Sequence, residues 1–359
     1  MTTSPLVNRI VLICAQLLVC GGVASGWEMG EPIVTYWGGP GFNAGVEDRT
    51  VEELRAGGWN MGWAKTASDL DVYQRHGMRG MIWIDTNNID DAGQVKKLDE
   101  VIEKVKGHPA MYAYFLGDEP GTGAFGSLGK IVAYLKEKDP AHAAYINLLP
   151  TYATGPQLQV TDDAAAKAKA GYPTNFAGVG ADDAMVLRYR DYLKEFVEVV
   201  KPDLISYDHY HFLKASDGGQ YFLNLALVRS EALAAGRPFV NIIQACDSPA
   251  EGWRGPNENE IRWLTYTSLA YGAGGISHFR YDTGLWKDPG VAKEPLDLYW
   301  GVSAINREFV AIGRELAGMK SVGVYHCGVV PMGGVGLPRD GVFKVEGKEV
   351  LLGYFGKAG

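Results

Sequence analysis

Residues 111–120 have the sequence Met-Tyr-Ala-Tyr-Phe-Leu-Gly-Asp-Glu-Pro, in which six mostly apolar residues lead directly into two adjacent carboxylates and a proline. A parallel-sheet strand that is covered on both faces is a near-continuous apolar run rather than an alternation of apolar and polar residues. In barrels built from such strands, chemistry takes place where the strands end. The stretch therefore predicts a buried strand that carries Asp118 and Glu119 at its carboxyl end.

Seven further stretches have the pattern of buried strands, and helical patterns lie between them. The eight expected strands cover residues 33–37, 59–64, 79–84, 111–116, 144–148, 204–207, 239–244 and 275–279. Apolar residues recur at helical spacing in 95–105 and in 305–316, and Asn257 with Glu260 fits a capping box. Eight such units in about 290 residues predict a (β/α)8 barrel rather than an open doubly wound sheet. No glycine-rich phosphate fingerprint follows the first strand, which argues against a dinucleotide-binding fold.

Composition and charge limit the possible partners. The chain has 359 residues and a formal net charge of -8, so it offers no basic stripe for nucleic acid. Two of the four cysteines, Cys246 and Cys327, lie outside the amino-terminal segment, and two cysteines do not make a disulfide framework. The oligomeric state stays open.

Residues 1–26 have the layout of an export signal. Arg9 precedes an apolar run at 10–19, which is followed by Cys20 and by small residues up to an expected cleavage site after Ala24. The apolar run is short for a membrane span, so no stable span is expected after cleavage. A lipoprotein signal at Cys20 and an uncleaved anchor are the alternatives. We expect an exported protein, periplasmic or secreted.

The rest of the chain divides into a barrel and a short extension. The barrel is expected at 27–318, with an insertion at 150–182 that forms a rim or lid over the carboxyl ends of the strands. After Met319 the helical pattern stops, and residues 342–351 have the pattern of a hairpin that turns near Gly347. We expect a carboxyl-terminal β extension at 319–359, either very small or incomplete.

Polar and aromatic side chains gather where the expected strands end. The candidates, in chain order, are Trp37, Trp63, Lys65, Asp85, Asp118, Glu119, Asn147, Asp208, His209, Tyr210, Gln244, Asp247, Glu251, Arg280, Tyr281 and Trp286. Sugars need this mixture, because their C–H faces pack on aromatic rings while their hydroxyl groups need polar partners. The sequence therefore predicts a carbohydrate substrate and no cofactor.

Glu119 is the candidate for the acid that glycosidic bond cleavage requires. The end of an apolar strand desolvates a carboxyl group, and the neighbouring Asp118 further disfavours loss of its proton. Asp118 itself is expected to orient Glu119. The alternative is that one of the two caps the next helix or pairs with an arginine.

Three segments resemble a known family. They are residues 112–120 with Gly-Asp-Glu-Pro, residues 205–210 with Ile-Ser-Tyr-Asp-His-Tyr, and residues 269–277 with Leu-Ala-Tyr-Gly-Ala-Gly-Gly-Ile-Ser. Together they resemble the barrel glycoside hydrolases of the large retaining clan, most closely family 42 β-galactosidase-like proteins and uncharacterised bacterial relatives. The resemblance implies an acid/base glutamate at the end of the fourth strand, which Glu119 matches with Asp118 in place of the usual asparagine. It also implies a nucleophilic glutamate at the end of the seventh strand, where this chain has Gln244.

This departure opens two questions. If hydrolysis takes place, another carboxylate must serve, and the candidates are Asp208, Asp247, Glu251, Asp282 and Asp85. Asp208 is favoured because aromatic residues flank it at a strand end, although a structural salt bridge or hydrogen bond to Lys65 or Arg280 is an equal alternative. If no carboxylate serves, the protein is a non-catalytic carbohydrate-binding barrel.

A metal-dependent sugar isomerase or lyase is the third hypothesis, and it would use Asp208, His209 and His211. Side chains alternate along a strand, so Asp208 faces one side while both histidines face the other. Only His278 could join them from another strand, and we therefore predict no metal site. Among the tryptophans, Trp83 is expected in the core, and Trp286 is expected to line the pocket.

Overall fold

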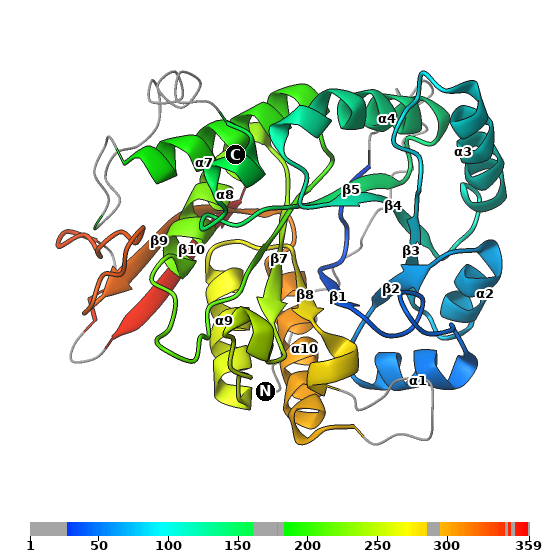
Figure 1. Ribbon diagram of the computed structural model, residues 1–359. Coiled ribbons are helices and arrows are strands. Elements are labelled where there is room, and N and C mark those ends of the chain that lie inside the picture. The colour runs from blue at the N-terminus through cyan, green and yellow to red at the C-terminus, as the bar shows by residue number, and fades with distance from the viewer. Residues whose placement is uncertain are drawn as a thin grey trace, which may run out of the picture.

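The computed structural model describes residues 27–160, 178, 183–285, 295–341, 344–345 and 349–357. Eight parallel strands form one sheet that curls into a nearly closed barrel (Figure 1). They are β1 (Ile33–Trp37), β2 (Met61–Ala64), β3 (Arg79–Trp83), β4 (Met111–Asp118), β5 (Ala143–Leu148), β6 (Ile205–His209), β7 (Phe239–Gln244) and β8 (Gly275–Phe279). Consecutive strands pair from β2 to β8, and β8 pairs with β1. Between β1 and β2, the Asn60 amide donates to the Val34 carbonyl at 3.1 Å.

Helices surround the barrel, as the repeat predicts (Figure 1). They are α1 (Asp48–Ala56), α2 (Ala67–Arg75), α3 (Ala92–Val105), α4 (Phe125–Lys138), α5 (Gly155–Leu158), α7 (Ala184–Glu195), α8 (Tyr221–Ala235), α9 (Glu258–Ala270) and α10 (Asp297–Glu315). Single turns η1 (Thr122–Ala124), η2 (Phe196–Val200), η3 (Pro249–Glu251) and η4 (Tyr281–Leu285) join them. The expected capping box opens α9, since the Asn257 side chain accepts from the Glu260 amide and the Glu260 carboxylate accepts from the Asn257 amide. The predicted (β/α)8 barrel is confirmed.

Aromatic rings fill the barrel just below its carboxyl end. Trp37 on β1 contacts Trp63 on β2, Phe115 on β4 and Phe279 on β8, with ring centroids 5.0, 5.6 and 6.5 Å apart. Contact between strands that are not neighbours in the sheet places these rings inside the barrel. They form the floor of the barrel mouth, and the barrel is a packed core rather than a pore.

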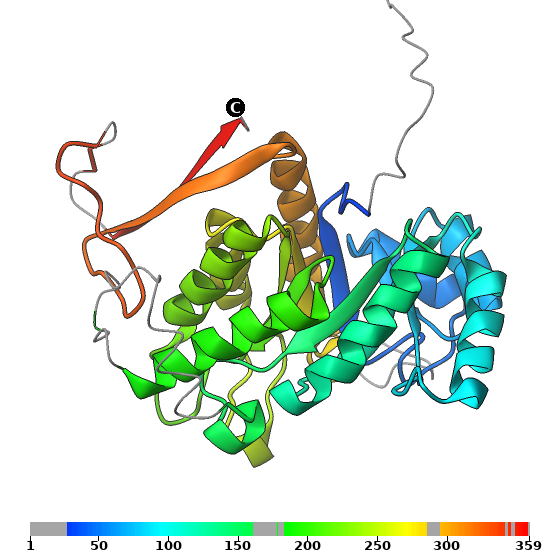
Figure 2. The same cartoon turned by 90° about the horizontal axis from the view of Figure 1, so that it is seen from above.

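The predicted carboxyl-terminal β extension is also present. Strand β9 (Met319–Cys327) pairs antiparallel with β10 (Val350–Lys357), and Figure 2 shows the pair running from the end of α10 along one side of the barrel. Leu351 pairs with His326, so the expectation that residue 351 pairs within a local hairpin at 342–351 is wrong. Residues 342–343 and 346–348 lie outside the described residues.

Several expectations fall on segments that the structure does not describe. These are the export signal at 1–26, most of the insertion at 150–182, and Trp286. Among the residues that are described, no helix is long and apolar enough to cross a membrane.

Candidate functional site

Asn147 connects two acidic side chains at the carboxyl ends of β4, β5 and β6. Its side-chain amide donates to Asp118 Oδ1 at 3.0 Å and to Asp208 Oδ1 at 2.8 Å. Its own oxygen accepts from Ser206 Oγ at 3.2 Å, which fixes the orientation of the amide. Both amide protons are therefore used to hold the two carboxylates. Because parallel strands end at the same edge of a sheet, three residues that are distant in sequence meet here.

Glu119 follows directly after β4 in a conformation that is uncommon for its residue type. Its φ of 48° lies in the left-handed region, and its amide donates to the Asn147 carbonyl at 2.8 Å. Left-handed backbone at a residue other than glycine is costly and is concentrated at functional sites. The side chain is exposed at the barrel mouth. A ligand that entered the mouth could therefore reach the Glu119 carboxyl group.

Asp208 is the buried partner of Glu119. Only 1% of Asp208 is exposed, and its Oδ2 has no hydrogen-bond partner of standard geometry among the described residues. Burial, followed by the charge of Glu119, raises the pKa of Asp208 well above its ordinary value, while the bond from Asn147 opposes this. Although Glu119 is exposed at the mouth, the surrounding protein partly desolvates its carboxyl group, and this desolvation and the charge of Asp118 raise its pKa, while its interaction with Asp208 opposes that shift.

The two carboxyl groups therefore behave as a pair. Two neighbouring carboxyl groups cannot both ionise at low cost, because their charges repel each other. Because Asp208 is far less exposed than Glu119, the proton resides preferentially on Asp208.

An aromatic cavity adjoins the carboxylates. Burial and then the charge of Asp208 raise the pKa of Tyr210, with smaller contributions from Tyr152, Asp118 and Glu119. Its ring packs on Trp253 at 4.3 Å and on Phe279 at 5.0 Å. A cavity of about 330 Å³ lies beside it, within the size range of ligand pockets. Its lining includes Tyr152, His209, Tyr210, Leu213, Gln220 and Trp253.

Trp83 extends the aromatic surface toward solvent. It is 39% exposed, so the expectation that it lies in the core is wrong. It ends β3 above Phe115 and Trp63, at 4.9 and 5.8 Å, and its indole donates to Asp85 Oδ1 at 2.8 Å. Trp37 and Trp63, two predicted stacking residues, are almost completely buried. They support the exposed Trp83 ring rather than presenting faces of their own.

Gln244 has a structural position at the end of β7. Its amide nitrogen donates to the carbonyls of Phe212 and Arg254 at 3.1 and 2.9 Å, and its oxygen accepts from the Phe212 amide at 2.8 Å. The residue is fully buried. These bonds join two loops, so the expectation that Gln244 contacts substrate is not supported by its geometry.

Arg280 and Tyr281 are also committed to other contacts. Arg280 pairs with Asp282 at 2.5 Å, which accounts for one of the two cations proposed as partners of Asp208. Tyr281 is buried against Tyr36 and Trp59, both at 5.2 Å, and is therefore a core residue instead of a substrate contact.

The remaining candidates lie outside the acidic cluster. Lys65, Asp247 and Glu251 are exposed, and within the described chain no hydrogen bond or ion pair connects them to Asp208. His209 faces α8, as alternation along the strand predicts, and its Nδ1 contacts Asn224 Oδ1 at 2.9 Å. Burial lowers the pKa of His209 to about 4. Among the described residues, no three histidine, cysteine or acidic side chains are grouped to hold a metal.

Two aromatic residues of the cavity, Tyr152 and Trp253, were not among the candidates from the sequence. Both lie on loops after β5 and β7, where no periodic pattern marks a buried or ligand-facing side. Only their aromatic character was visible in the sequence.

No family model and no curated protein sequence matches the chain. Among solved structures, a protein of Bacteroides thetaiotaomicron assigned as an α-L-fucosidase has a TM-score of 0.51 at 13% identity, with 82% of this chain and 100% of that one covered. An endo-1,4-β-D-mannanase of Thermotoga petrophila RKU-1 has a TM-score of 0.47 at 11% identity, with 79% and 99% covered. A β-glucuronidase of Lactobacillus rhamnosus has a TM-score of 0.45 at 15% identity, with 77% of this chain and 50% of that chain covered. The chain thus spans about half the length of that glucuronidase. At these identities the first likeness shows the barrel fold alone.

Proposed function

We propose that the protein is an exported glycoside hydrolase in which Glu119 protonates the leaving glycosidic oxygen. The observation that carries the proposal is the acidic cluster at the barrel mouth, where Asn147 bonds to Asp118 and to the buried Asp208, Glu119 follows Asp118, and aromatic rings lie beside them. The structural neighbours, which include proteins described as a fucosidase, a mannanase and a glucuronidase, give further support at the level of fold. The motif resemblance favours a family 42-like relative, and the layout of residues 1–26 supports export.

The two carboxyl groups have different tasks in this proposal. Glu119 is accessible and is the member of the pair that meets substrate. Asp208 is buried too deeply to contact a sugar, so it acts as a positioning residue that holds the proton of the pair near neutral pH. In the proposed step this proton passes from Asp208 to Glu119 as Glu119 protonates the leaving oxygen, and Asp208 is left as the carboxylate. This revises the expectation that Asp208 serves directly as base or nucleophile. Trp83 and Tyr210 offer the aromatic faces on which a sugar stacks.

The test compares Glu119→Gln with Asp247→Asn on oligosaccharides and on aryl glycosides with leaving groups of different basicity. General acid catalysis typically contributes about 10²- to 10⁴-fold, so Glu119→Gln should lose activity in that range on oligosaccharides. The loss should be smaller on dinitrophenyl glycosides, because their leaving group needs little protonation. Asp247→Asn, which changes an exposed carboxylate outside the acidic cluster, should retain activity. Undiminished hydrolysis of oligosaccharides by Glu119→Gln would remove the assignment.

A non-catalytic carbohydrate-binding barrel is the second candidate. The observation that favours it is Gln244, whose amide is bonded to loop backbone where the resemblance implies a nucleophilic carboxylate. Calorimetry that detects oligosaccharide binding, together with no product after long incubation, would select this function. Turnover that is abolished in Glu119→Gln would reject it.

A further inference from the structure

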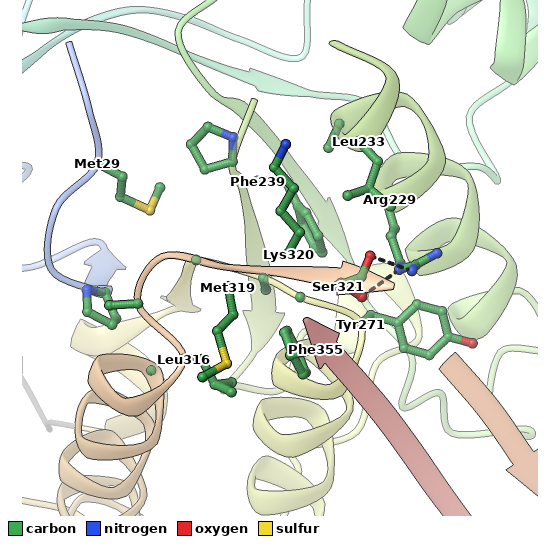
Figure 3. Close-up of a pocket in the computed structure, with 18 of the residues that line it drawn as sticks. Met29, Arg229, Leu233, Phe239, Tyr271, Leu316, Met319, Lys320, Ser321 and Phe355 are labelled. Atoms are coloured by element: carbon green, nitrogen blue, oxygen red, sulfur yellow. Dashed lines mark hydrogen bonds between the residues drawn. The ribbon is translucent and has the colours of Figure 1, made fainter. Parts of the chain in front are cut away.

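A second cavity lies at the opposite end of the barrel from Glu119. It has a volume of about 370 Å³ and is bounded by the amino ends of β7 and β8, the end of α8, the end of α10 and the start of β9 (Figure 3). We call it the lower cavity, and it is defined here by Met29, Arg229, Arg237, Phe239, Lys320 and Phe355. Its size lies at the lower end of the range typical of small-molecule sites.

The charge of the lower cavity is one-sided. Arg229, Arg237 and Lys320 line it, and no aspartate or glutamate does. Within the described residues none of the three forms an ion pair, whereas Arg75 and Arg254 elsewhere on the surface pair with carboxylates. In a chain of net charge -8, three cations around one cavity that has no acidic lining residue create a local positive charge that would attract an anion.

Arg229 is held in place for such a role. Its Nε donates to Ser321 Oγ at 3.0 Å and its Nη2 donates to the Ser321 carbonyl at 3.1 Å, which anchors the side chain from α8 to β9 (Figure 3). Burial holds the pKa of the Arg229 guanidinium below its ordinary value. A partly buried cation without a counter-ion is costly, and a ligand carboxylate would offset that cost. Ser321 Oγ accepts from Arg229, so its own proton is available to a ligand.

The rest of the lining is apolar. Phe239 is buried at the base of the cavity, and Leu233, Leu316, Met319 and Phe355 lie around it. In Figure 3, Lys320 projects from the start of β9 past Phe239 toward Leu233, so that a charged group and an apolar surface share one space. A fully hydrated inorganic anion would leave this apolar surface unused.

We propose that the lower cavity binds an amphipathic organic anion, a carboxylate attached to an apolar chain. The head group contacts Lys320, Arg229 and the Ser321 hydroxyl, while the chain packs on Phe239 and Phe355. The site is separate from the acidic cluster, because it lies at the amino ends of the strands. It does not depend on the glycosidase proposal.

Calorimetry on the full chain with decanoate, 1-decanol and acetate tests the ligand chemistry. We expect decanoate to bind with one-to-one stoichiometry and at least tenfold more tightly than either 1-decanol or acetate. Decanol that binds as tightly as decanoate would reduce the cavity to an apolar hole and overturn the proposal. Acetate that binds as tightly as decanoate, or decanoate that does not bind, would also overturn it.

Variants then test the location. Lys320→Met keeps the apolar stem and removes the charge of an exposed residue, so the fold should persist, as melting curves would verify. We expect it to weaken decanoate binding at least tenfold and to leave 1-decanol binding unchanged. Lys104→Met on α3, which removes a lysine far from the cavity, should bind both probes as the unmodified protein does. Decanoate affinity unchanged in Lys320→Met would exclude the lower cavity as the site.

Discussion

Replacement of Asp208 by asparagine should stabilise the protein at neutral pH. The asparagine oxygen can still accept from Asn147, and its amide group occupies the place of Oδ2, which has no hydrogen-bond partner of standard geometry among the described residues. The substitution removes a carboxyl group that is 1% exposed and that faces the charge of Glu119. If Asp208 supplies the proton that Glu119 donates, the same variant should also lose hydrolytic activity.

The pH dependence follows from the direction in which the pKa of Asp208 moves. When the pKa of a carboxyl group is higher in the folded state than its unfolded value of about 3.9, the group contributes fully to stability at pH values below 3.9. This contribution to stability is lost as the pH rises through the folded pKa. At higher pH, each tenfold by which the folded state weakens the acid costs about 1.4 kcal/mol of stability. Asp208→Asn removes this dependence, so the difference between variant and unmodified protein should grow from pH 4 upward. At pH 7 to 8 we expect a gain of about 1.4 kcal/mol for each tenfold by which the folded state weakens Asp208 as an acid.

Urea unfolding at pH 4, 5, 6, 7 and 8 measures the effect. The matched control is Asp247→Asn, an exposed aspartate, whose effect should stay within about 0.5 kcal/mol at every pH. Glu119→Gln should lower the pKa of Asp208, because it removes the neighbouring charge, and should therefore recover part of the same stability. An Asp208→Asn protein that is less stable than the unmodified one at pH 7, or a difference that does not change with pH, would refute the pairing of the two carboxyl groups.

Three further predictions concern the surroundings of the pair. Trp63→Ala should cost about 3 to 5 kcal/mol of stability in urea unfolding, whereas Trp83→Ala should cost little, because only Trp63 is fully buried. Trp83→Ala should nevertheless weaken oligosaccharide binding, as calorimetry would show. Gln244→Glu should destabilise the protein by about 3 kcal/mol or more without raising activity, because a carboxylate would face two carbonyl oxygens. A stable and more active Gln244→Glu protein would contradict the role of Gln244 in joining the two loops. Burial lowers the pKa of both His209 and His278 to about 4, so their neutral forms favour the folded state. This contribution to the free energy of unfolding should be fully present above pH 6.5 and be lost as the pH falls toward 4. Urea unfolding across this pH range would check this, and the free energy of unfolding of His278→Gln should fall less than that of the unmodified protein.

The barrel was predictable because its strands are apolar runs that end in polar residues. The bounds of β1, β7 and β8 match the expected ranges, whereas β6 continues two residues further than expected, through Asp208 and His209. Strand periodicity does not mark this end, because polar side chains that face the mouth interrupt the apolar run. The antiparallel partner of β10 was not predictable, because β9 lies more than twenty residues earlier in the chain.

The candidate site divides in a similar way. The proximity of Asp118, Asn147 and Asp208 follows from strand order alone, since neighbouring parallel strands end side by side. The loop bonds of Gln244 and the ion pair of Arg280 depend on how loops fold back, and no local pattern records that. Strand-end position therefore predicted which residues meet, but not which of them remain available to a ligand.

The same geometry leads to an expectation about stereochemistry that departs from the family resemblance. A covalent glycosyl intermediate needs an ionised carboxylate that faces the anomeric carbon about 5 to 5.5 Å from the acid. Gln244 cannot serve because it carries no carboxylate, and Asp208 is buried with a pKa raised well above its ordinary value. Without a nucleophile, water must attack the anomeric carbon directly, and a second carboxylate at the mouth must accept the proton of that water. Hydrolysis should then invert the configuration, as proton NMR of the first product would show, and 2-deoxy-2-fluoro glycosyl fluorides should leave the protein mass unchanged. A retained product together with a labelled Asp208 would instead require that this side chain moves into the mouth and ionises during turnover.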